Sequence, residues 1–573
     1  MTDQSLAKKL RDHRLTTAKS LNDSVTFLRQ HRFFLLLFAF AAVLFLSDIW
    51  IYKQFVRAES YFAFGSRLMI EQGNWLMPHA PDELPLNKPP LTYWLIGISF
   101  KLFGVSYGAA RLPSVLAALL VLALVYLLSI RLNGKRVALI SAAMLASSLL
   151  FLTFARMAMS DMLLTLCVTA SLAAFIFTLS EQGSNSKALV LLGYVALALG
   201  VLAKGPVAVV LVGAPIALEI IFRRNRADLK KLRLLPGSVL FLLIAAPYFL
   251  IVYAAAGAGP LRFFFLGENL QRFTGSLYSA SGRSVVFLCA AFFGNFAPWS
   301  ILVLVALWFN WRGRDGNAQT SRLIHLWFGV TIVLFSLSSF KVDYYLLPAM
   351  PAAALIIAPV IANAEALPRP ARLLVKGILT LCSGILVALA ALSLKAAAVL
   401  AIVTPLRLLP FALALVGLAV LIVYLRSRQT WWIYFVLSAT IWATFLAAQL
   451  IMLPPFVRYL PAPRLAAATP FGSVLYTSHA ASDWANDIAF NLPPPHKVER
   501  LADDTWNKGL LDALESDSKS IAVVTESEYQ KLWAQNPNLR IIAQAETFGH
   551  GGLSLNLIRN PKRQRLLLIG HEP

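Results

Sequence analysis

The sequence predicts a polytopic α-helical membrane protein with a small C-terminal α/β domain outside the membrane. Of its 573 residues, 58% are hydrophobic and 14% are charged, whereas soluble domains have about 45 to 50% and about 25%. Apolar stretches of roughly 20 residues, long enough to cross a bilayer as a helix, recur along the chain. After Leu453 the apolar runs shorten and charged residues become more frequent.

The apolar stretches predict about thirteen transmembrane helices within residues 33–452. The first runs from Phe33 to Tyr52, after a basic leader at residues 1–32. The leader is too long for a signal peptide and no small-residue cleavage site follows it, so we expect it to stay attached. The other stretches lie near 112–130, 137–151, 162–180, 187–203, 205–222, 235–255, 286–309, 323–339, 345–365, 376–394, 407–425 and 431–452.

The basic residues indicate which way the chain crosses the membrane. The net charge of +23 would suggest nucleic acid in a soluble protein. Here lysines and arginines gather in the leader and in alternate connections, such as Arg131 to Arg136 and Arg223 to Arg233. With a cytoplasmic N-terminus, these connections also lie in the cytoplasm. We therefore expect anionic membrane lipids as partners of the basic residues and no nucleic acid.

The same count places the loops with unusual polar residues on the outer face, which predicts one shared site there. They include the long loop 53–111 and the segments 154–161, 204–206, 256–285 and 341–345. The three cysteines, Cys167, Cys289 and Cys382, lie within predicted spans and lack metal-ligand spacing. We expect neither a disulfide nor a cysteine metal site.

An odd number of crossings also places residues 453–573 outside. Prolines between 454 and 470 mark a linker to this domain. Short β-like segments alternate with helix-like stretches near 480–490, 505–516 and 526–534, as is typical of a small α/β unit. The β-like segments are Ser473–Tyr476, Ser520–Val524, Arg540–Ala543, Leu553–Ile558 and Leu566–Ile569.

A series of motifs in one order resembles the bacterial dolichyl-phosphate-mannose-protein mannosyltransferase-like glycosyltransferases. The motifs are Glu59-x-Tyr61, Gly73-Asn-Trp75, Lys88-Pro-Pro-Leu-x-Tyr-Trp94, Gly108-Ala-Ala-Arg111, Arg156-Met-Ala-Met-Ser-Asp161, Leu202-Ala-Lys-Gly-Pro206, Arg262 to Arg272, Pro298-Trp299 and Lys341-Val-Asp-Tyr-Tyr-Leu-Leu-Pro348. The resemblance implies a GT-C glycosyltransferase in the bacterial inner membrane. It would take a sugar from a polyprenyl-phosphate donor at the outer face and pass it to a lipid, glycan or protein, by similarity a lipid A-type glycolipid.

This chemistry needs cations near the departing phosphate. The candidates for binding the donor phosphate are Lys88, Arg111, Arg156, Lys204, Arg272 and Lys341. Candidates for other substrate contacts are Tyr61, Tyr93, Glu268, Asp343 and Tyr345. Any one cation also has a simpler explanation as a side chain that reaches from a span end to the interface, which we favour for Lys101 and Arg262. About half of the loop aromatics are expected to belong to the interfacial belt.

Two carboxylates are candidates for catalysis, Glu59 and Asp161. The family often carries an Asp-Glu pair in its first outer loop, and this chain has Ala58-Glu59 instead. One branch of the family has a glutamate directly before Lys-Pro-Pro, where this chain has Asn87. We therefore name no metal ligands: a divalent cation is a possible cofactor, but Asn87 weakens the case for it.

Two alternatives to an enzyme remain open. A transporter or flippase also combines a helix bundle with intramembrane charges and Gly-Pro breaks, although inverted repeats are not visible. A noncatalytic relative of the family is the second alternative, for which Ala58 is the main argument.

Overall fold

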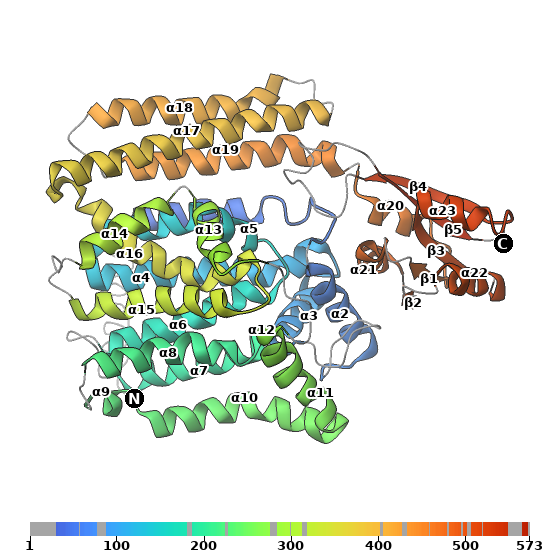
Figure 1. The fold of residues 1–573 in the computed structure, drawn as a ribbon, viewed down its shortest axis with the longest axis horizontal. Helices are drawn as coiled ribbons and strands as arrows, with labels where there is room; N and C mark the ends of the chain where they lie inside the picture. Colours follow the sequence, from blue (N-terminus) through green and yellow to red (C-terminus); the bar gives the residue numbers. More distant parts are fainter. Residues whose placement is uncertain are drawn as a thin grey trace, which may run out of the picture.

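The protein is a bundle of long helices with an α/β unit at one end (Figure 1). The computed structural model describes residues 30–570 except 57, 77–87, 180–185, 224–226, 276–282, 298, 312–317, 401–404, 427–431, 458, 478–480, 494–496, 501–505, 518 and 548–563. Among the described residues, six helices are long and apolar enough to cross a membrane. The chain is thus a multi-pass membrane protein, as its hydropathy predicts.

Each predicted apolar stretch falls largely on helical residues, although the first, Phe33 to Tyr52, is helical only as far as Leu46. The first helix is Gln30–Leu46. The long elements that follow are α4 (Tyr107–Ser147), α6 (Ser160–Leu179), α7 (Lys187–Lys204), α8 (Val207–Arg223), α10 (Leu234–Ala256), α15 (Ala318–Leu337), α16 (Met350–Ala362), α17 (Arg369–Val399), α18 (Leu409–Arg426) and α19 (Trp432–Val457). The number of about thirteen crossings stays a prediction.

Two stretches differ in detail from their sequence pattern. Helix α4 covers two predicted spans and is kinked at Gly134, whose φ of 82° lies in the left-handed region that glycine tolerates. The stretch 286–309 is divided into α13 (Val286–Asn295) and α14 (Ile301–Trp311). Between them, the Ser300 hydroxyl donates a hydrogen bond of 2.6 Å to the Phe293 carbonyl oxygen and so replaces a helical backbone bond.

Short elements gather at the end of the bundle that carries the α/β unit (Figure 1). They are α2 (Glu59–Gln72), α3 (Leu91–Phe103), α5 (Leu149–Phe154), α11 (Ala258–Arg262), η1 (Phe263–Gln271), α12 (Arg272–Thr274) and η2 (Asp343–Ala349). Helix α9 (Ala227–Lys231), with its two lysines, lies at the opposite end. The polar loops are therefore separated from this basic connection by the length of the bundle.

The α/β unit contains a five-stranded sheet in the order β2-β1-β3-β5-β4. Its elements are β1 (Val474–Thr477), α21 (Ser482–Asn491), β2 (Lys497–Arg500), α22 (Trp506–Ser516), β3 (Ser520–Thr525), α23 (Glu526–Trp533), β4 (Arg540–Thr547) and β5 (Gln564–Gly570). The first three strands in chain order are parallel, and β5 pairs antiparallel with β3 and β4. The predicted α/β class is confirmed, strand β2 was missed, and the expected strand at 553–558 lies outside the described residues.

Helix α2 is fastened to the α/β unit by Arg67. The guanidinium donates hydrogen bonds to the carbonyl oxygens of Phe490 and Leu492, both at 2.6 Å, and of Ala489 at 3.3 Å. These carbonyls end α21, where the helix dipole favours a cation. Nearby, both carboxylate oxygens of Asp487 lie 3.1 Å from the Phe55 backbone nitrogen. The α/β unit thus contacts the loop that leads into α2.

Candidate active site

A cavity of about 620 Å³ lies where α2 and η1 meet the ends of α6, α7 and α15. Five charged side chains line it, namely Lys88, Asp161, Lys204, Glu268 and Arg272. Most of the remaining wall is apolar or aromatic and is formed by Ala58, Tyr61, Phe62, Met159, Pro206, Val207, Val210, Phe264, Phe265, Leu270, Phe273, Leu334, Phe335, Tyr344 and Tyr345. Cations beside an apolar wall suit an amphiphile with an anionic group.

One oxygen of Glu268 joins two of the cations. Glu268 Oε2 lies 2.7 Å from Lys88 Nζ and 2.9 Å from Arg272 Nη1. The Glu268 side chain is 2% exposed, whereas Lys88 and Arg272 are 23% and 22% exposed. Burial lowers the pKa of Lys88, and the carboxylate of Glu268 opposes that shift. The two cations therefore keep accessible faces while sharing one carboxylate.

A second ion pair joins Asp161, near the start of α6, to Lys204, the last residue of α7. The Lys204 ammonium also lies 5.2 Å from the ring centre of Tyr345, within cation-π range. Helix α7 ends at Gly205, whose φ is 94°. A Cβ at this position would lie 2.7 Å from the Phe264 ring, so glycine is needed for the close approach of η1 to the lysine turn.

The acidic and aromatic part of the wall belongs to a π-helix. Element η1 places Phe264, Phe265, Glu268 and Asn269 along the cavity. The Asn269 amide donates a hydrogen bond of 2.7 Å to the Phe264 carbonyl oxygen. Runs of π-helix are rare and often occur at functional sites. Hydrophobic periodicity did not predict this element, and residues 262–272 stood out in the sequence only as one motif of the family resemblance.

Glu59 lies beneath the cavity wall rather than on it. Its side chain is fully buried. Glu59 Oε1 accepts hydrogen bonds from Arg111 Nε at 3.0 Å and from the Ala158 backbone N–H at 2.8 Å, and Oε2 accepts from the Val56 N–H at 2.9 Å. The carboxylate thereby joins the first outer loop, α4 and the turn before α6. Glu59 is therefore not among the residues that line the cavity, and a catalytic role for it stays a prediction.

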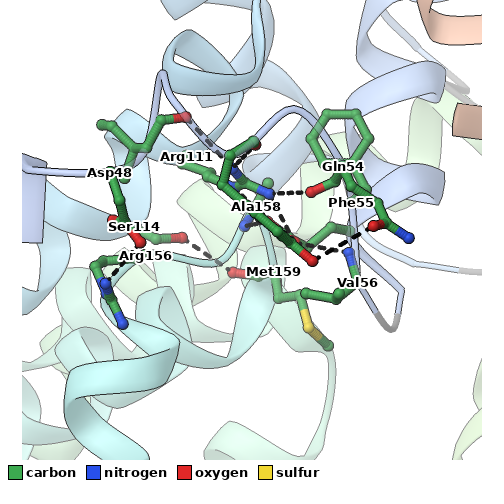
Figure 2. A network of polar contacts seen from close by, with 12 residues as sticks. Asp48, Gln54, Phe55, Val56, Arg111, Ser114, Arg156, Ala158 and Met159 are labelled. Atoms are coloured by element: carbon green, nitrogen blue, oxygen red, sulfur yellow. Dashed lines mark hydrogen bonds and ion pairs between the residues drawn. The ribbon is translucent and has the colours of Figure 1, made fainter. Parts of the chain in front are cut away.

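Arg111 and Arg156 lie in the same buried region, shown in Figure 2. Arg111 is 3% exposed and also donates to the carbonyl oxygens of Ile49, Tyr52 and Gln54. Arg156 donates to Asp48 Oδ2 at 2.8 Å and stacks over the ring of Phe445. We call Asp48, Glu59, Arg111 and Arg156 the buried ion-pair network. Its bonds fix backbone segments next to the cavity.

Ala58 occupies a cavity-facing position directly before the buried glutamate. At this position the family resemblance leads one to expect an aspartate. Tyr61, one helical turn further along α2, also lines the cavity. The chain has therefore kept the acid that holds the loop and has a methyl group where an acid would face the substrate.

The remaining predicted residues lie around the cavity without lining it. Tyr93 is 2% exposed and packs 5.1 Å from the Phe62 ring. Lys341 is 6% exposed, and its carbonyl oxygen accepts a hydrogen bond from Arg283. Asp343 begins η2, which carries Tyr345 to the cavity wall.

Within the described residues, no group of three or more histidine, cysteine, aspartate or glutamate side chains is arranged to hold a metal ion. Asn87, on which the sequence argument about a divalent cation depends, lies outside the described residues. Metal dependence therefore stays an open expectation.

Comparison with known proteins indicates the family of this chain. Residues 87–251 match the family described as dolichyl-phosphate-mannose-protein mannosyltransferase. An uncharacterised protein of Aquifex aeolicus is 30% identical over 62% of this chain and 68% of its own length. An undecaprenyl phosphate-alpha-4-amino-4-deoxy-L-arabinose arabinosyl transferase of Pectobacterium carotovorum is 29% identical over 63% of this chain, which spans 64% of that relative.

The fold matches a crystal structure of ArnT from Cupriavidus metallidurans bound to undecaprenyl phosphate. The TM-score is 0.74 at 21% identity, and the match covers 93% of this chain and 98% of that chain. The fold, the family match and the relatives together define a membrane glycosyltransferase with the GT-C fold. The chain belongs to the dolichyl-phosphate-mannose-protein mannosyltransferase-like family.

Proposed function

We propose that this enzyme transfers a sugar from a polyprenyl-phosphate donor to a glycolipid or other membrane-linked acceptor at the outer face of the bacterial inner membrane. The observation that carries the proposal is the convergence of Lys88, Lys204 and Arg272 on one cavity whose other wall is apolar. Cations there bind the donor phosphate, and the apolar wall accepts the first isoprene units. The relatives named as arabinosyl transferases support this donor class.

In the proposed reaction, the bond between the anomeric carbon and the donor phosphate oxygen breaks, and its electron pair stays on the phosphate. A new bond forms from that carbon to an acceptor oxygen. Lys88, Lys204 and Arg272 stabilise the charge that grows on the departing phosphate. If the acceptor is a hydroxyl, Asp161 is the cavity carboxylate that receives its proton, with Lys204 fixing its position.

The carboxylates that line the cavity bear on which acceptor the enzyme uses. A phosphate acceptor is already anionic near neutral pH, while a hydroxyl needs a base. The fully buried Glu59 and the methyl group of Ala58 leave Asp161 and Glu268 as the carboxylates lining the cavity within the described residues, and both are ion-paired. An acceptor that needs little deprotonation, such as the phosphate of a lipid A-type glycolipid, fits this lining best.

The direct experiment supplies the purified enzyme in liposomes with 4-amino-4-deoxy-L-arabinosyl undecaprenyl phosphate and candidate acceptors. Release of undecaprenyl phosphate together with a glycosylated acceptor would support the proposal. Movement of the intact donor across the bilayer without release would favour a flippase. A noncatalytic relative would bind the donor and do neither.

The proposed topology places the cavity and the α/β domain in the periplasm and the N-terminus in the cytoplasm. It rests on the basic connection at α9, which lies at the bundle end opposite the cavity. Reporters active on one side of the membrane only, fused after Arg226 and after Pro573, should report opposite sides. Both fusions reporting the same side would overturn the topology and the outer position of the site.

A further inference from the structure

The cavity wall has more cationic than acidic side chains, and this difference bears on whether a singly or a doubly charged phosphate binds better. Among the described residues that line the cavity, three side chains are cationic and two are acidic, which leaves one positive charge. One of the acids, Glu268, is 2% exposed and is paired with both Lys88 and Arg272. A carboxylate in this place reduces the attraction of the site for anions, so a site that only had to bind phosphate tightly would gain by losing it.

We infer that Glu268 is a specificity-determining residue that matches the cavity to a singly charged phosphodiester and disfavours a doubly charged phosphate. The inference rests on the proposed function and assigns a role to a residue that takes no part in bond making. It applies to the donor, whose phosphate joins two carbon groups, and to the product, whose phosphate joins one.

Charge accounting gives the physical reason. A phosphodiester has one negative charge and neutralises the single excess positive charge of the wall. A phosphomonoester carries about −1.5 to −2 at pH 7, so it would leave about one buried negative charge uncompensated. Burying an unpaired charge is costly. When the anomeric bond breaks, the phosphate gains that extra charge. Glu268 then favours release of the product, polyprenyl phosphate, from the cavity.

The geometry places Glu268 where it acts on the phosphate directly. Its Oε2 lies within 2.9 Å of a nitrogen of both Lys88 and Arg272, and all three side chains line the cavity. A phosphate that contacts these two cations must lie next to the carboxylate. The other cavity acid, Asp161, is paired with Lys204 instead. Glu268 is thus the acid that two of the phosphate-binding candidates share.

Two probes that differ by one charge test the inference. They are undecaprenyl phosphate, a monoester, and its methyl ester, a singly charged diester, with binding to the full chain in detergent measured at pH 7.5. The glutamate variant E268Q raises the net charge of the cavity wall by one. We expect it to shift the ratio of the two dissociation constants by about tenfold toward the monoester, which corresponds to about 1.4 kcal/mol. Product inhibition should deepen in parallel.

Two further variants keep the test decisive if E268Q folds poorly. E268D retains the charge and should keep the wild-type ratio, whereas R272Q removes a cation and should shift the ratio toward the methyl ester. The matched control is E219Q, which removes a buried carboxylate paired with Arg322 between α8 and α15, away from the cavity lining. It should leave the ratio unchanged.

The outcomes separate this inference from the proposed function. Wild-type protein that binds neither probe and turns over no donor overturns the proposed function. Wild-type protein that binds both probes and turns over donor, with a ratio unchanged in E268Q, overturns the role of Glu268 alone. Equal weakening of both probes in E268Q also overturns it, since Glu268 would then only position Lys88 and Arg272.

Discussion

The five charged residues that line the cavity, which we call the cavity cluster, and the buried ion-pair network use the same residue types for different purposes. The cavity cluster consists of Lys88, Asp161, Lys204, Glu268 and Arg272. In the cavity, Lys88 and Arg272 share a carboxylate and stay more than one-fifth exposed. In the network, the side chains of Glu59 and Arg111 are 0% and 3% exposed. They form an ion pair with each other and hydrogen bonds with neighbouring backbone groups. Charged groups that remain partly hydrated can exchange partners with a substrate, whereas fully enclosed groups hold the chain in place. Exposure thus separates Lys88 and Arg272 from Glu59 and Arg111, whereas the cations of the pairs Asp161–Lys204 and Asp48–Arg156 have similar, intermediate exposures.

The largest expected effect is on turnover and belongs to the cavity cluster. Asp161→Asn removes the carboxylate beside Lys204 and keeps its size and part of its hydrogen bonding. We expect turnover of a hydroxyl acceptor to fall by roughly 10²- to 10⁴-fold while donor binding is nearly kept. The measurement is product formed per folded molecule, together with donor affinity. A rate within a few fold of wild type with a hydroxyl acceptor would exclude Asp161 as the base; with a phosphate acceptor, which needs no base, the substitution should change the rate little.

The next effect is on stability and belongs to the network. Glu59→Gln leaves the Arg111 guanidinium buried without its counter-ion, at a cost of about 3 to 5 kcal/mol. We expect a clear fall in melting temperature and yield, with the rate per folded molecule within a few fold of wild type. Glu71→Gln, on the same helix and paired with Arg67 at 27% exposure, is the matched control and should cost far less. A stable Glu59→Gln protein with a lost rate would instead return Glu59 to catalysis.

A smaller effect is expected for one phosphate contact. Lys88→Ala should lower donor turnover by about tenfold, the roughly 1.4 kcal/mol of one charge-assisted contact. Lys101→Ala provides the comparison, because Lys101 lies over the Trp75 ring and is not a cavity residue. The same rate in the two variants would contradict the assignment of Lys88.

Arg156→Ala should instead act mainly on folding, since Arg156 is bound to Asp48 in the network.

The smallest effect is a shift of pH dependence. Burial lowers the pKa of Lys88, so its ammonium loses its proton at a lower pH than an ordinary lysine. The phosphate contact requires the charged form, and donor affinity should therefore fall as pH rises through this lowered pKa. In Lys88→Arg the charge persists, so the alkaline fall should move to higher pH. Superimposable alkaline limbs in the two proteins would exclude Lys88 as the titrating group.

The sequence predicted the helix bundle and the α/β class well, because burial in lipid and in a sheet leaves a local pattern in hydropathy. It missed β2, which has only four residues, Lys497–Arg500, three of them charged. It also missed the π-helix η1, since a single added residue per turn leaves no periodic trace. Such features depend on packing between distant segments.

For the site, the motifs singled out Lys88, Asp161, Lys204, Glu268 and Arg272, and the structure places these five around one cavity. The sequence could not distinguish these cavity-lining residues from Glu59, Arg111 and Arg156, because the ion pairs are formed between residues far apart in the chain. Arg111 and Glu59, for example, are 52 positions apart.

The hydrogen bonds from Arg67 to the end of α21 also have a consequence for biogenesis. The carbonyl oxygens that receive its hydrogen bonds lie 422 to 425 positions later in the chain. Chains fold from their N-terminal end during synthesis, so α2 is synthesised long before its partner exists. The part of the cavity wall on α2 can reach its final position only after the α/β unit has been translated. A ribosome that stalls after the final span would leave a fully inserted bundle with an unfinished site.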